Sequence, residues 1–316
     1  MKIIFYGTPE FAVHSLKALV NNSFEILAVV TAPDKPSGRG LTLNESAIKK
    51  YAVSKNLKVL QPTNLKDDDF ISEIKDLDPE IQVVVAFRMM PQKLWSLPKF
   101  GTFNLHASLL PNYRGAAPIN WAIINGEDIS GVTTFFLKHE IDTGDIILQK
   151  SITIGENETA GELHDKLMIH GAELIISTMT LIKNGDFKTL SQDSVTSVND
   201  VVKSAPKLNN ENCHIDWSKD DSNVHNLVRG LSPYPSAFTY LNDGTERLKK
   251  FKIIRSRISE RTTNQAPGTI LIEQGNMYVA CGNRLLELLE VQLEGKKKMK
   301  VSEFVKGFRL TQEMHF

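Results

Sequence analysis

The sequence predicts an α/β protein in two parts, an open parallel sheet followed by a small β-barrel. Over the first half, short apolar runs alternate with helical stretches. These runs lack the period-2 polarity of half-exposed strands, which is typical of a Rossmann-like parallel sheet covered on both faces. Later in the chain, short strands separated by turns favour a barrel. The expected strands of the sheet are Ile3–Tyr6, Ile26–Thr31, Leu57–Leu60, Gln82–Ala86 and Phe103–His106.

Signals for helix ends and a change in composition divide the chain. Thr8 is expected to cap a first helix, with Pro9 at its first helical position. Thr159 and Glu162 have the spacing of a capping box, and the helix that they open should run to about Lys183. A polar stretch follows it. We therefore predict a first domain over residues 1–189, a linker over 190–206 and a second domain over 207–316.

Composition excludes several classes of protein. With 316 residues, of which 23% are charged and 41% hydrophobic, the chain resembles folded rather than disordered proteins. No apolar run reaches the roughly 18 residues of a membrane span, and the first strand is too short for a signal peptide. We therefore expect a cytoplasmic protein with no membrane partner. Cys213 and Cys281 lack metal-ligand spacing, so no metal is expected. Residues 207–316 carry 17 Lys and Arg against 13 Asp and Glu, which permits a polyanionic partner but also fits an ordinary solvated surface.

The turn after the first expected strand lacks the glycines of a dinucleotide site. That fingerprint requires G-x-G-x-x-G, whereas residues 7–12 read Gly-Thr-Pro-Glu-Phe-Ala. Residues 38–40, Gly-Arg-Gly, follow the second strand and do not open a helix after the first. No Walker A motif occurs in the sequence. A nicotinamide or flavin cofactor is therefore not expected.

Three polar residues predict a centre for acyl transfer. Asn104 and His106 alternate along one expected strand, so their side chains share a face while Leu105 points into the core. The amide and the imidazole can both donate to one carbonyl oxygen, and Asp142 can orient the ring and help to take a proton. No Ser or Cys lies in a nucleophile elbow, so a substrate amine is the expected nucleophile. The alternative for Asp142 is a turn-stabilising pair with Asp145.

Several motifs in a fixed order extend this interpretation over nearly the whole chain. They are residues 1–12 (MKIIFYGTPEFA), 31–40 (TAPDKPSGRG), 104–118 and 205–240. Together they resemble the formyltransferase family that uses 10-formyltetrahydrofolate, and within it the methionyl-tRNA formyltransferases. The resemblance implies a Rossmann-like formyltransferase domain followed by an OB-like, tRNA-binding β-barrel. It also implies 10-formyltetrahydrofolate as the formyl-donor cosubstrate, and as catalytic residues Asn104, His106 and Asp142.

A folate site must hold a flat pterin in an apolar slot with backbone groups at its edge. Apolar residues at strand ends are more often simply core. One segment also departs from the family: residues 86–91, Ala-Phe-Arg-Met-Met-Pro, are one residue shorter than usual and have Arg88 in place of Gly. The loop that faces the pterin is therefore expected to differ in shape. The expected folate-binding residues are Phe87, Met89, Met90, Ser108, Leu109, Leu110, Pro111 and Ile141.

Two features favour a tRNA acceptor over the amino sugars and glycinamide ribonucleotide that related formyltransferases use. The loop at residues 33–40 resembles an insertion that contacts the tRNA acceptor stem, and Arg39 matches its basic residue. Segments of the C-terminal part also follow the family, among them 225–230 (HNLVRG). A lysine run within that part, Lys296, Lys297 and Lys298, would track phosphates. The expected partner is initiator methionyl-tRNA, which a monomeric enzyme would convert to N-formylmethionyl-tRNA.

Plainer interpretations of these features remain. The loop around Arg39 fits a flexible surface loop, and a lysine run is usually a solvated face. A rival from another class is an RNA-binding protein that kept the barrel and lost the chemistry. The presence of Asn104, His106 and Asp142 argues against that rival.

Overall fold

The computed structural model describes residues 1–37, 42–185, 187–195, 201–242, 248–308 and 315–316. Its contacts divide the chain into two compact units. The first comprises residues 1–115, 130–152 and 164–204, and the second comprises 116–129, 153–163 and 205–316. The units interleave along the chain, so the domain order 1–189, 190–206 and 207–316 stays a prediction. Each unit is described by itself.

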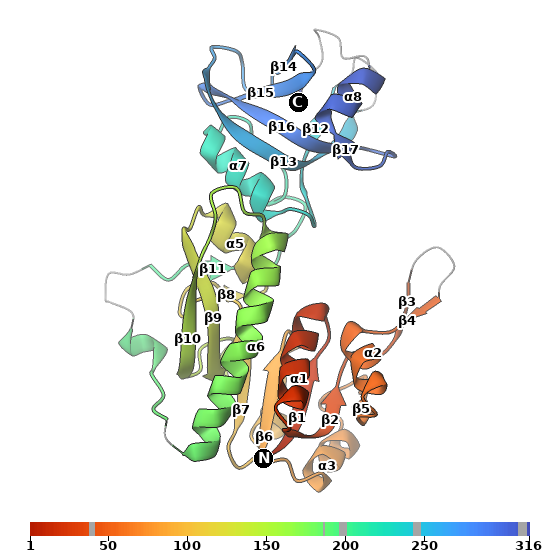
Figure 1. Ribbon diagram of the computed structural model, residues 1–316, viewed down its shortest axis with the longest axis vertical. Helices are drawn as coiled ribbons and strands as arrows, with labels where there is room; N and C mark the ends of the chain where they lie inside the picture. The colour runs from red at the N-terminus through yellow and green to blue at the C-terminus, as the bar shows by residue number, and fades with distance from the viewer. Residues whose placement is uncertain (38–41, 186, 196–200, 243–247, 309–314) are drawn as a thin grey trace. The chain divides into compact units, whose positions relative to one another are not determined.

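The first unit is built on a sheet whose described strands follow the order β10-β9-β7-β6-β1-β2-β5 (Figure 1). The five expected strands are confirmed to within about two residues, and they pair in parallel. Strand β9 then pairs antiparallel to β7 and extends the sheet beyond the parallel core. The bounds are β1 (Lys2–Gly7), β2 (Glu25–Val30), β5 (Val59–Leu60), β6 (Ile81–Val85), β7 (Thr102–His106), β9 (Ile129–Phe136) and β10 (Ile146–Thr153).

The helix ends show which signals the backbone uses. The first helix, α1, begins at Glu10 with Pro9 as its cap residue, so the expectation that Thr8 caps it is wrong by one position. Pro9 has extended backbone angles, φ −80° and ψ 176°, which places it before the helix. The long helix α6 begins after Thr159 and ends before Gly185, as predicted. The helical elements before residue 200 are α1 (Glu10–Asn21), α2 (Ala47–Ser54), α3 (Asp68–Asp76), α4 (Gln92–Trp95), α5 (Pro118–Ile124), α6 (Ala160–Asn184) and the 3-10 turn η1 (Gln192–Ser194).

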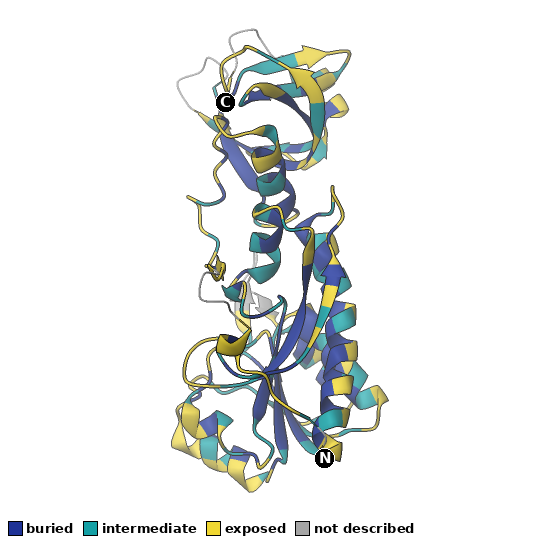
Figure 2. Cartoon of the chain, turned by 90° about the vertical axis from the view of Figure 1, so that its left-hand side faces the viewer, coloured by how far each residue is buried: buried dark blue, intermediate teal, exposed yellow. Residues whose placement is uncertain are grey.

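Packing of α6 against β7 decides which face of that strand is free for chemistry. A Cβ built on Gly171 would lie 2.7 Å from Leu105 Cδ2, so the helix backbone passes directly over this side chain. The hydroxyls of Thr134 and Thr178 are 2.8 Å apart and join β9 to the same helix. Figure 2 shows the central strands of this sheet in the dark blue of buried residues, whereas an outer strand such as β10 also carries exposed residues. Since side chains alternate, Asn104 and His106 project from the face of β7 away from α6.

The second unit has an antiparallel sheet in the order β12-β13-β16-β15-β14, with β17 paired to β16. Its core includes Trp217, Phe251 and Phe304. The predicted α/β class is confirmed, with a Rossmann-like sheet first and a barrel-like β domain after it. None of the helices in the described ranges is long and apolar enough to cross a membrane. The elements are α7 (Asp221–Gly230), β12 (Ala237–Leu241), β13 (Lys249–Thr262), β14 (Ile270–Glu273), β15 (Asn276–Cys281), β16 (Arg284–Leu293), β17 (Met299–Lys300) and α8 (Val301–Gly307).

Candidate active site

His106, the last residue of β7, is held through one of its ring nitrogens. Its Nε2 lies 2.8 Å from the backbone carbonyl oxygen of Tyr113. Because a carbonyl oxygen can only accept, this contact requires the hydrogen on Nε2 and leaves Nδ1 to gain or lose a proton. That second nitrogen lies 3.8 Å from Asp142 Oδ2, and the two side chains are 8% and 13% exposed. A distance of 3.8 Å is too long for a direct hydrogen bond between Nδ1 and Oδ2. A substrate atom placed beside them can therefore form hydrogen bonds to both groups.

Asp142 lies in the turn between β9 and β10, and its backbone has φ +56°, in the left-handed region. Non-glycine residues adopt this region at a cost of about 1–2 kcal/mol. Its Oδ2 also accepts a hydrogen bond from the backbone N–H of Gly115, at 3.0 Å. The carboxylate is therefore aimed by the loop after β7 as well as by its own turn. The structure brings Asp142 and His106 together. Asp145 instead pairs with Lys138 at 2.7 Å.

Asn104 leaves its side-chain amide free. Among the described residues, this amide has no hydrogen-bond partner in the protein. Its side chain is half-buried, two positions before His106 on the face of β7 away from α6. A free amide N–H near a histidine and a carboxylate can donate to an oxygen that becomes negative during a reaction. The three residues predicted to be catalytic thus provide a donor beside a pair of proton-accepting groups.

The loop that follows β7 is fixed by two strands that the sequence did not predict. Thr133 on β9 donates to the carbonyl oxygen of Ser108 at 2.6 Å and accepts from the N–H of Leu110 at 3.2 Å. Gln149 on β10 donates to the carbonyl oxygen of Leu110 at 2.8 Å. Sequence reasoning missed both residues because their strands were not expected. It also missed the role of Tyr113, which acts through its backbone and so gives no residue-type signal.

Within the loop after β7, two of the residues expected at the folate site, Ser108 and Leu110, are buried by the protein itself. Ser108 is fully buried, and its hydroxyl donates to the carbonyl oxygen of Asn112 at 2.7 Å. Leu110 packs in the core with Phe135 and Ile146. Leu109 and Pro111 are half-buried in the same loop. Of this loop, the backbone and the half-buried side chains remain available to a ligand.

The segment after β6 and the turn before β10 expose apolar side chains. Met89 is 71% exposed and Ile141 is 59% exposed, whereas Met90 is buried and Phe87 half-buried in the neighbouring core. The unusual Arg88 donates to the carbonyl oxygens of Pro62 and Thr63, so it ties this segment to the loop after β5. Met89 and Ile141 are therefore the two expected folate residues whose side chains are most accessible to a ligand.

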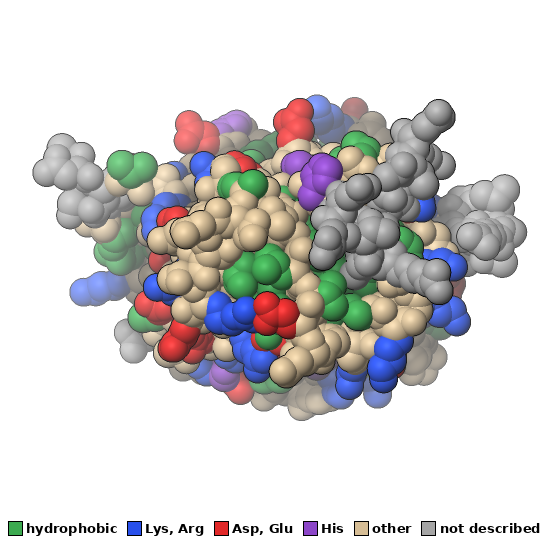
Figure 3. Space-filling model, turned by 90° about the horizontal axis from the view of Figure 1, so that it is seen from above, with side chains coloured by type: hydrophobic (Ala, Val, Ile, Leu, Met, Phe, Trp, Pro, Cys, Tyr) green, Lys and Arg blue, Asp and Glu red, His purple; other side chains and the backbone are tan. Residues whose placement is uncertain are grey.

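The residues expected to bind tRNA are placed unevenly. Arg39 lies outside the described residues, in the connection between the short antiparallel strands β3 (Lys35–Ser37) and β4 (Thr42–Asn44). Lys296, Lys297 and Lys298 are exposed at the turn between β16 and β17. Lys298 pairs with Glu290 at 3.1 Å. In Figure 3, among the described residues, Lys and Arg side chains lie beside acidic ones on the left of the face in view, whereas on the lower right blue side chains have no red ones between them.

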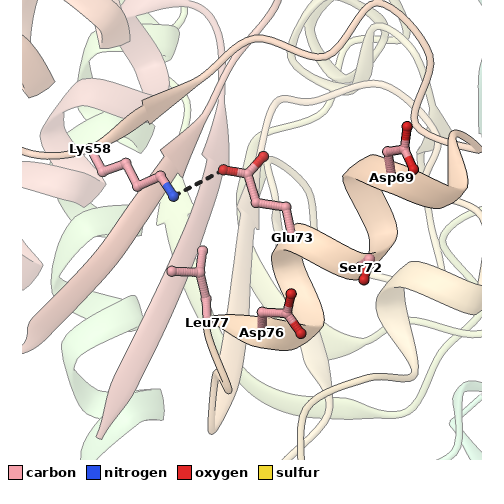
Figure 4. Close-up of a pocket in the computed structure, with 6 residues that line it drawn as sticks. All are labelled: Lys58, Asp69, Ser72, Glu73, Asp76 and Leu77. Carbon is pink, nitrogen blue, oxygen red and sulfur yellow. Dashed lines mark ion pairs between the residues drawn. The ribbon is translucent and has the colours of Figure 1, made fainter.

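Other parts of the described chain offer less. One hollow is lined mainly by the acidic helix α3 and contains the ion pair of Lys58 with Glu73, at 2.9 Å (Figure 4). None of the predicted site residues lines it. Within the described ranges, no group of three His, Cys, Asp or Glu side chains is placed to hold a metal ion.

Two family models match the chain: formyl transferase over residues 1–179 and the formyl transferase C-terminal domain over residues 207–309. An α/β domain followed by a β domain is thus assigned to formyl transfer. The chain belongs to the formyl transferase family. Relatives that align over nearly the whole chain are proteins named methionyl-tRNA formyltransferase. Those of Flavobacterium johnsoniae and Porphyromonas gingivalis are 49% and 42% identical to this chain. These alignments cover 99% and 100% of this chain and 98% of each relative.

Solved structures share the fold at low sequence identity. An N-formyltransferase from Helicobacter canadensis, in complex with folinic acid and dTDP-3-aminofucose, is 22% identical with a TM-score of 0.68, over 91% of this chain and 98% of that one. HypX from Aquifex aeolicus in complex with tetrahydrofolic acid is 17% identical with a TM-score of 0.63, over 96% of this chain and 47% of that one. The resemblance stated from the sequence motifs is confirmed.

Proposed function

We propose that this protein transfers the formyl group of 10-formyltetrahydrofolate to the free amino group of initiator methionyl-tRNA. The product is N-formylmethionyl-tRNA, which serves translation initiation. The observation that carries the proposal is an identity of 42–49% with methionyl-tRNA formyltransferases over nearly the whole of both chains. The pairing of His106 with Asp142 beside the free amide of Asn104 supports it with a matching chemistry.

The nucleophile in this reaction is the amino group of the aminoacyl ester. Such α-amino groups titrate at about 7.7–8.0, so a useful fraction is neutral at physiological pH. Attack on the formyl carbon produces a tetrahedral oxyanion. The amide N–H of Asn104 donates to this oxygen, because it has no protein partner among the described residues that competes for it. Preorganised donors of this kind stabilise the charge at little cost in reorganisation.

The attacking amine must also lose a proton. His106 Nδ1 and Asp142 Oδ2 face each other across 3.8 Å, so an ammonium proton beside the gap can pass to either group. The contact of Nε2 with the carbonyl oxygen of Tyr113 fixes the ring with Nδ1 toward Asp142. The imidazolium formed on proton transfer is then stabilised by the carboxylate, and it can return the proton to the departing folate nitrogen.

The formyl donor is assigned to the apolar surface near this centre. Met89 and Ile141 are the exposed candidates for contact with the pterin ring, with Phe87 and Met90 behind them. Ser108, Leu109, Leu110 and Pro111 contribute chiefly a backbone that Thr133 and Gln149 hold in place. Folate derivatives are bound in the structures from Helicobacter canadensis and Aquifex aeolicus, which share this fold.

For the acceptor, we assign Arg39 to the acceptor stem and the turn of Lys296, Lys297 and Lys298 to tRNA phosphates. A guanidinium group suits both phosphate and base-edge recognition, so Arg39→Ala should lower kcat/KM for charged tRNA. A steady-state assay over a range of tRNA concentrations measures this effect. We further propose that the enzyme acts as a monomer in the cytoplasm, where charged tRNA is available.

A single experiment tests the proposal and its main rival. The purified protein is given 10-formyltetrahydrofolate together with either charged initiator tRNA or a nucleotide-linked amino sugar, and formyl incorporation is measured. We expect transfer to the tRNA and at most background transfer to the sugar. Preference for the amino sugar would assign the chain to sugar formylation, and binding of tRNA without any transfer would support the RNA-binding rival.

A further inference from the structure

Gln192 lies next to the turn that carries Asp142, although it belongs to the stretch expected to be a linker. It opens η1, two residues after Leu190. Leu190 exchanges both backbone hydrogen bonds with Ile146, the first residue of β10, at 2.8 and 2.9 Å. The side chain of Gln192 is 1% exposed. This glutamine is therefore a fixed part of the first unit.

The amide of Gln192 uses its nitrogen on the Asp142 turn. Nε2 donates to the backbone carbonyl oxygens of Asp142 and Gly144, both at 2.8 Å. A primary amide nitrogen has two hydrogens, so both are used on this one turn. Removing such a donor leaves buried carbonyl groups without a partner, at a typical cost of about 1–3 kcal/mol each.

The turn requires this support because its backbone is unusual at both bonded residues. Asp142 has a left-handed φ of +56°. A Cβ at Gly144 would lie 1.5 Å from the carbonyl oxygen of Phe136, so the chain passes too close there for any other residue. Without the two N–H donors, the turn is free to rotate its carbonyls toward other partners. The carboxylate of Asp142 would then move relative to His106 Nδ1.

Arg114 determines which way round the amide lies. Its Nε and Nη2 both donate to Gln192 Oε1, at 2.9 and 2.6 Å. A flipped amide would place its oxygen against the two carbonyls and its nitrogen against the guanidinium group, which is unfavourable on both sides. Arg114 therefore presents the nitrogen of Gln192 to the turn.

We propose that Gln192 is a positioning residue of formyl transfer. It holds the backbone of the Asp142 turn in the conformation that aims the carboxylate at His106, and Arg114 holds Gln192 in turn. Gln192 follows the sheet and helix α6 in the sequence. The proposed catalytic geometry therefore also depends on η1, in the segment between the two family-model matches. This inference rests on the proposed function, in which Asp142 takes part in proton transfer.

The test is a double-mutant cycle between Gln192 and Asp142. Gln192→Glu keeps the acceptor for Arg114 but replaces both donors with an oxygen that repels the two carbonyls. Alone, it should lower kcat by about 10- to 100-fold, as small displacements of catalytic groups do, with KM for the folate donor within about threefold. The pH profile of kcat should shift as well. In an Asp142→Ala background the same substitution should cost almost nothing further, because its effect passes through Asp142.

A matched control lies in the same 3-10 turn. Ser194 donates its hydroxyl only to the nearby carbonyl oxygen of Ser191 at 2.7 Å and is exposed, so Ser194→Ala should keep the kcat and pH profile of the wild type. Thermal midpoints are measured for every variant, and activity is assayed well below the lowest one. If Gln192→Glu does not fold, Gln192→Met removes both donors at nearly equal length and volume and takes its place in the cycle.

Two outcomes would overturn the proposal. One is wild-type kcat and pH profile in the folded Gln192 variant. The other is an equal loss in both backgrounds, which would indicate a general structural role. Failure of the proposed function is distinguishable, since it would appear as absent tRNA formylation by the wild type itself. The cycle can then be measured with whichever amine the enzyme formylates.

Discussion

Two histidines, one in each unit, are almost fully buried yet bonded in different ways. His106 is 7% exposed and His225 on α7 is 3% exposed. His225 Nδ1 lies 3.0 Å from the hydroxyl of Ser256, a direct hydrogen bond within the second unit. His106 instead presents its Nδ1 to Asp142 across 3.8 Å, too far for a direct bond. Burial alone therefore does not distinguish the histidine that we propose to be catalytic from one that is bonded within the fold.

The surroundings of each ring show the same difference. One turn after His225, Arg229 donates to the carbonyl oxygens of Gly155 and Glu158 at 3.3 and 3.2 Å, and so closes this part of the second unit. Near His106, the amide of Asn104 has no protein partner among the described residues. We interpret the unbonded groups near His106 as the place for substrate, and the hydrogen bonds of His225 Nδ1 and of Arg229 as contacts that stabilise the second unit.

The largest effect expected from this comparison is on turnover. Asn104→Ala, His106→Ala and Asp142→Ala should each lower turnover on charged tRNA by at least about 100-fold, because each removes a group that stabilises the transition state or moves its proton. Thermal midpoints should change least for Asn104→Ala, and should fall somewhat for His106→Ala and Asp142→Ala, which lose hydrogen bonds to Tyr113 and Gly115. Turnover is therefore compared per folded molecule. Near-normal turnover in all three variants would show that the assigned mechanism is wrong.

The local features of the site and of α6 could be predicted from the sequence. The alternation of Asn104 and His106 on one strand predicted a shared face, and the structure places both away from α6. The capping box of Thr159 and Glu162 is present, with the backbone N–H of Thr159 donating to Glu162 Oε2 at 2.8 Å. Such local signals depend on a few neighbouring residues, so the sequence alone contains them.

Longer-range contacts could not be predicted in this way. Tyr113 contacts His106 through its backbone carbonyl oxygen, which any residue type has. Gln192 contacts Asp142 from 50 residues further along the chain. Neither contact produces a spacing pattern in the sequence. The polar composition of the stretch after α6 indicated an exposed linker. Composition does not show which polar residue of such a stretch is buried, and here it is Gln192. For the same reason, the burial of Ser108 and Leu110 was not visible in the folate prediction.

The second expected effect is on stability and its pH dependence in the second unit. Burial, and then the charge of Arg229, lower the pKa of His225 below its ordinary value. The folded state thus binds this proton less readily than the unfolded chain. The stability contribution is fully present above about pH 6.5 and declines as the pH falls below that value toward the folded-state pKa.

His225→Asn tests this effect. The variant can still bond Ser256 but does not titrate, so its free energy of unfolding should fall less between pH 7.5 and pH 5.5 than that of the wild type. Urea unfolding at the two pH values measures the difference. At pH 7.5 His225→Ala should lose about 1–3 kcal/mol of stability through the lost hydrogen bond, while turnover per folded molecule stays unchanged. An identical pH dependence in His225→Asn and the wild type would show that His225 does not contribute to the pH dependence of stability.

A smaller effect is expected at the start of α6. Burial acts to raise the pKa of Glu162, but hydrogen bonds from Arg255 and from Thr159 outweigh it and lower the pKa to about 2. Thr159→Ala should cost about 0.5–2 kcal/mol in the free energy of unfolding, whereas Thr159→Ser keeps the cap and should cost little. The carboxylate's contribution should be present above about pH 4.5 and be lost as the pH falls toward 2. Glu162→Gln should remove that acid dependence, which chemical denaturation across this pH range can detect.

The smallest effect is expected at the lysine turn, where the comparison between bonded and free groups applies to charges on a surface. Lys298 pairs with Glu290 at 3.1 Å, whereas Lys296 and Lys297 form no ion pair within the described residues. Replacing Lys296 and Lys297 with Ala should weaken tRNA binding and reduce its salt slope by about 1–2, because fewer counterions are released. Lys298→Ala should change the salt slope less in the wild type than in a Glu290→Gln background, where Lys298 has lost its ion-pair partner.

Fluorescence titrations of tRNA at several salt concentrations provide both slopes, with folate binding as the control that should not change. If neither background changes the slope, the turn is an ordinary solvated surface, and tRNA phosphates are contacted elsewhere.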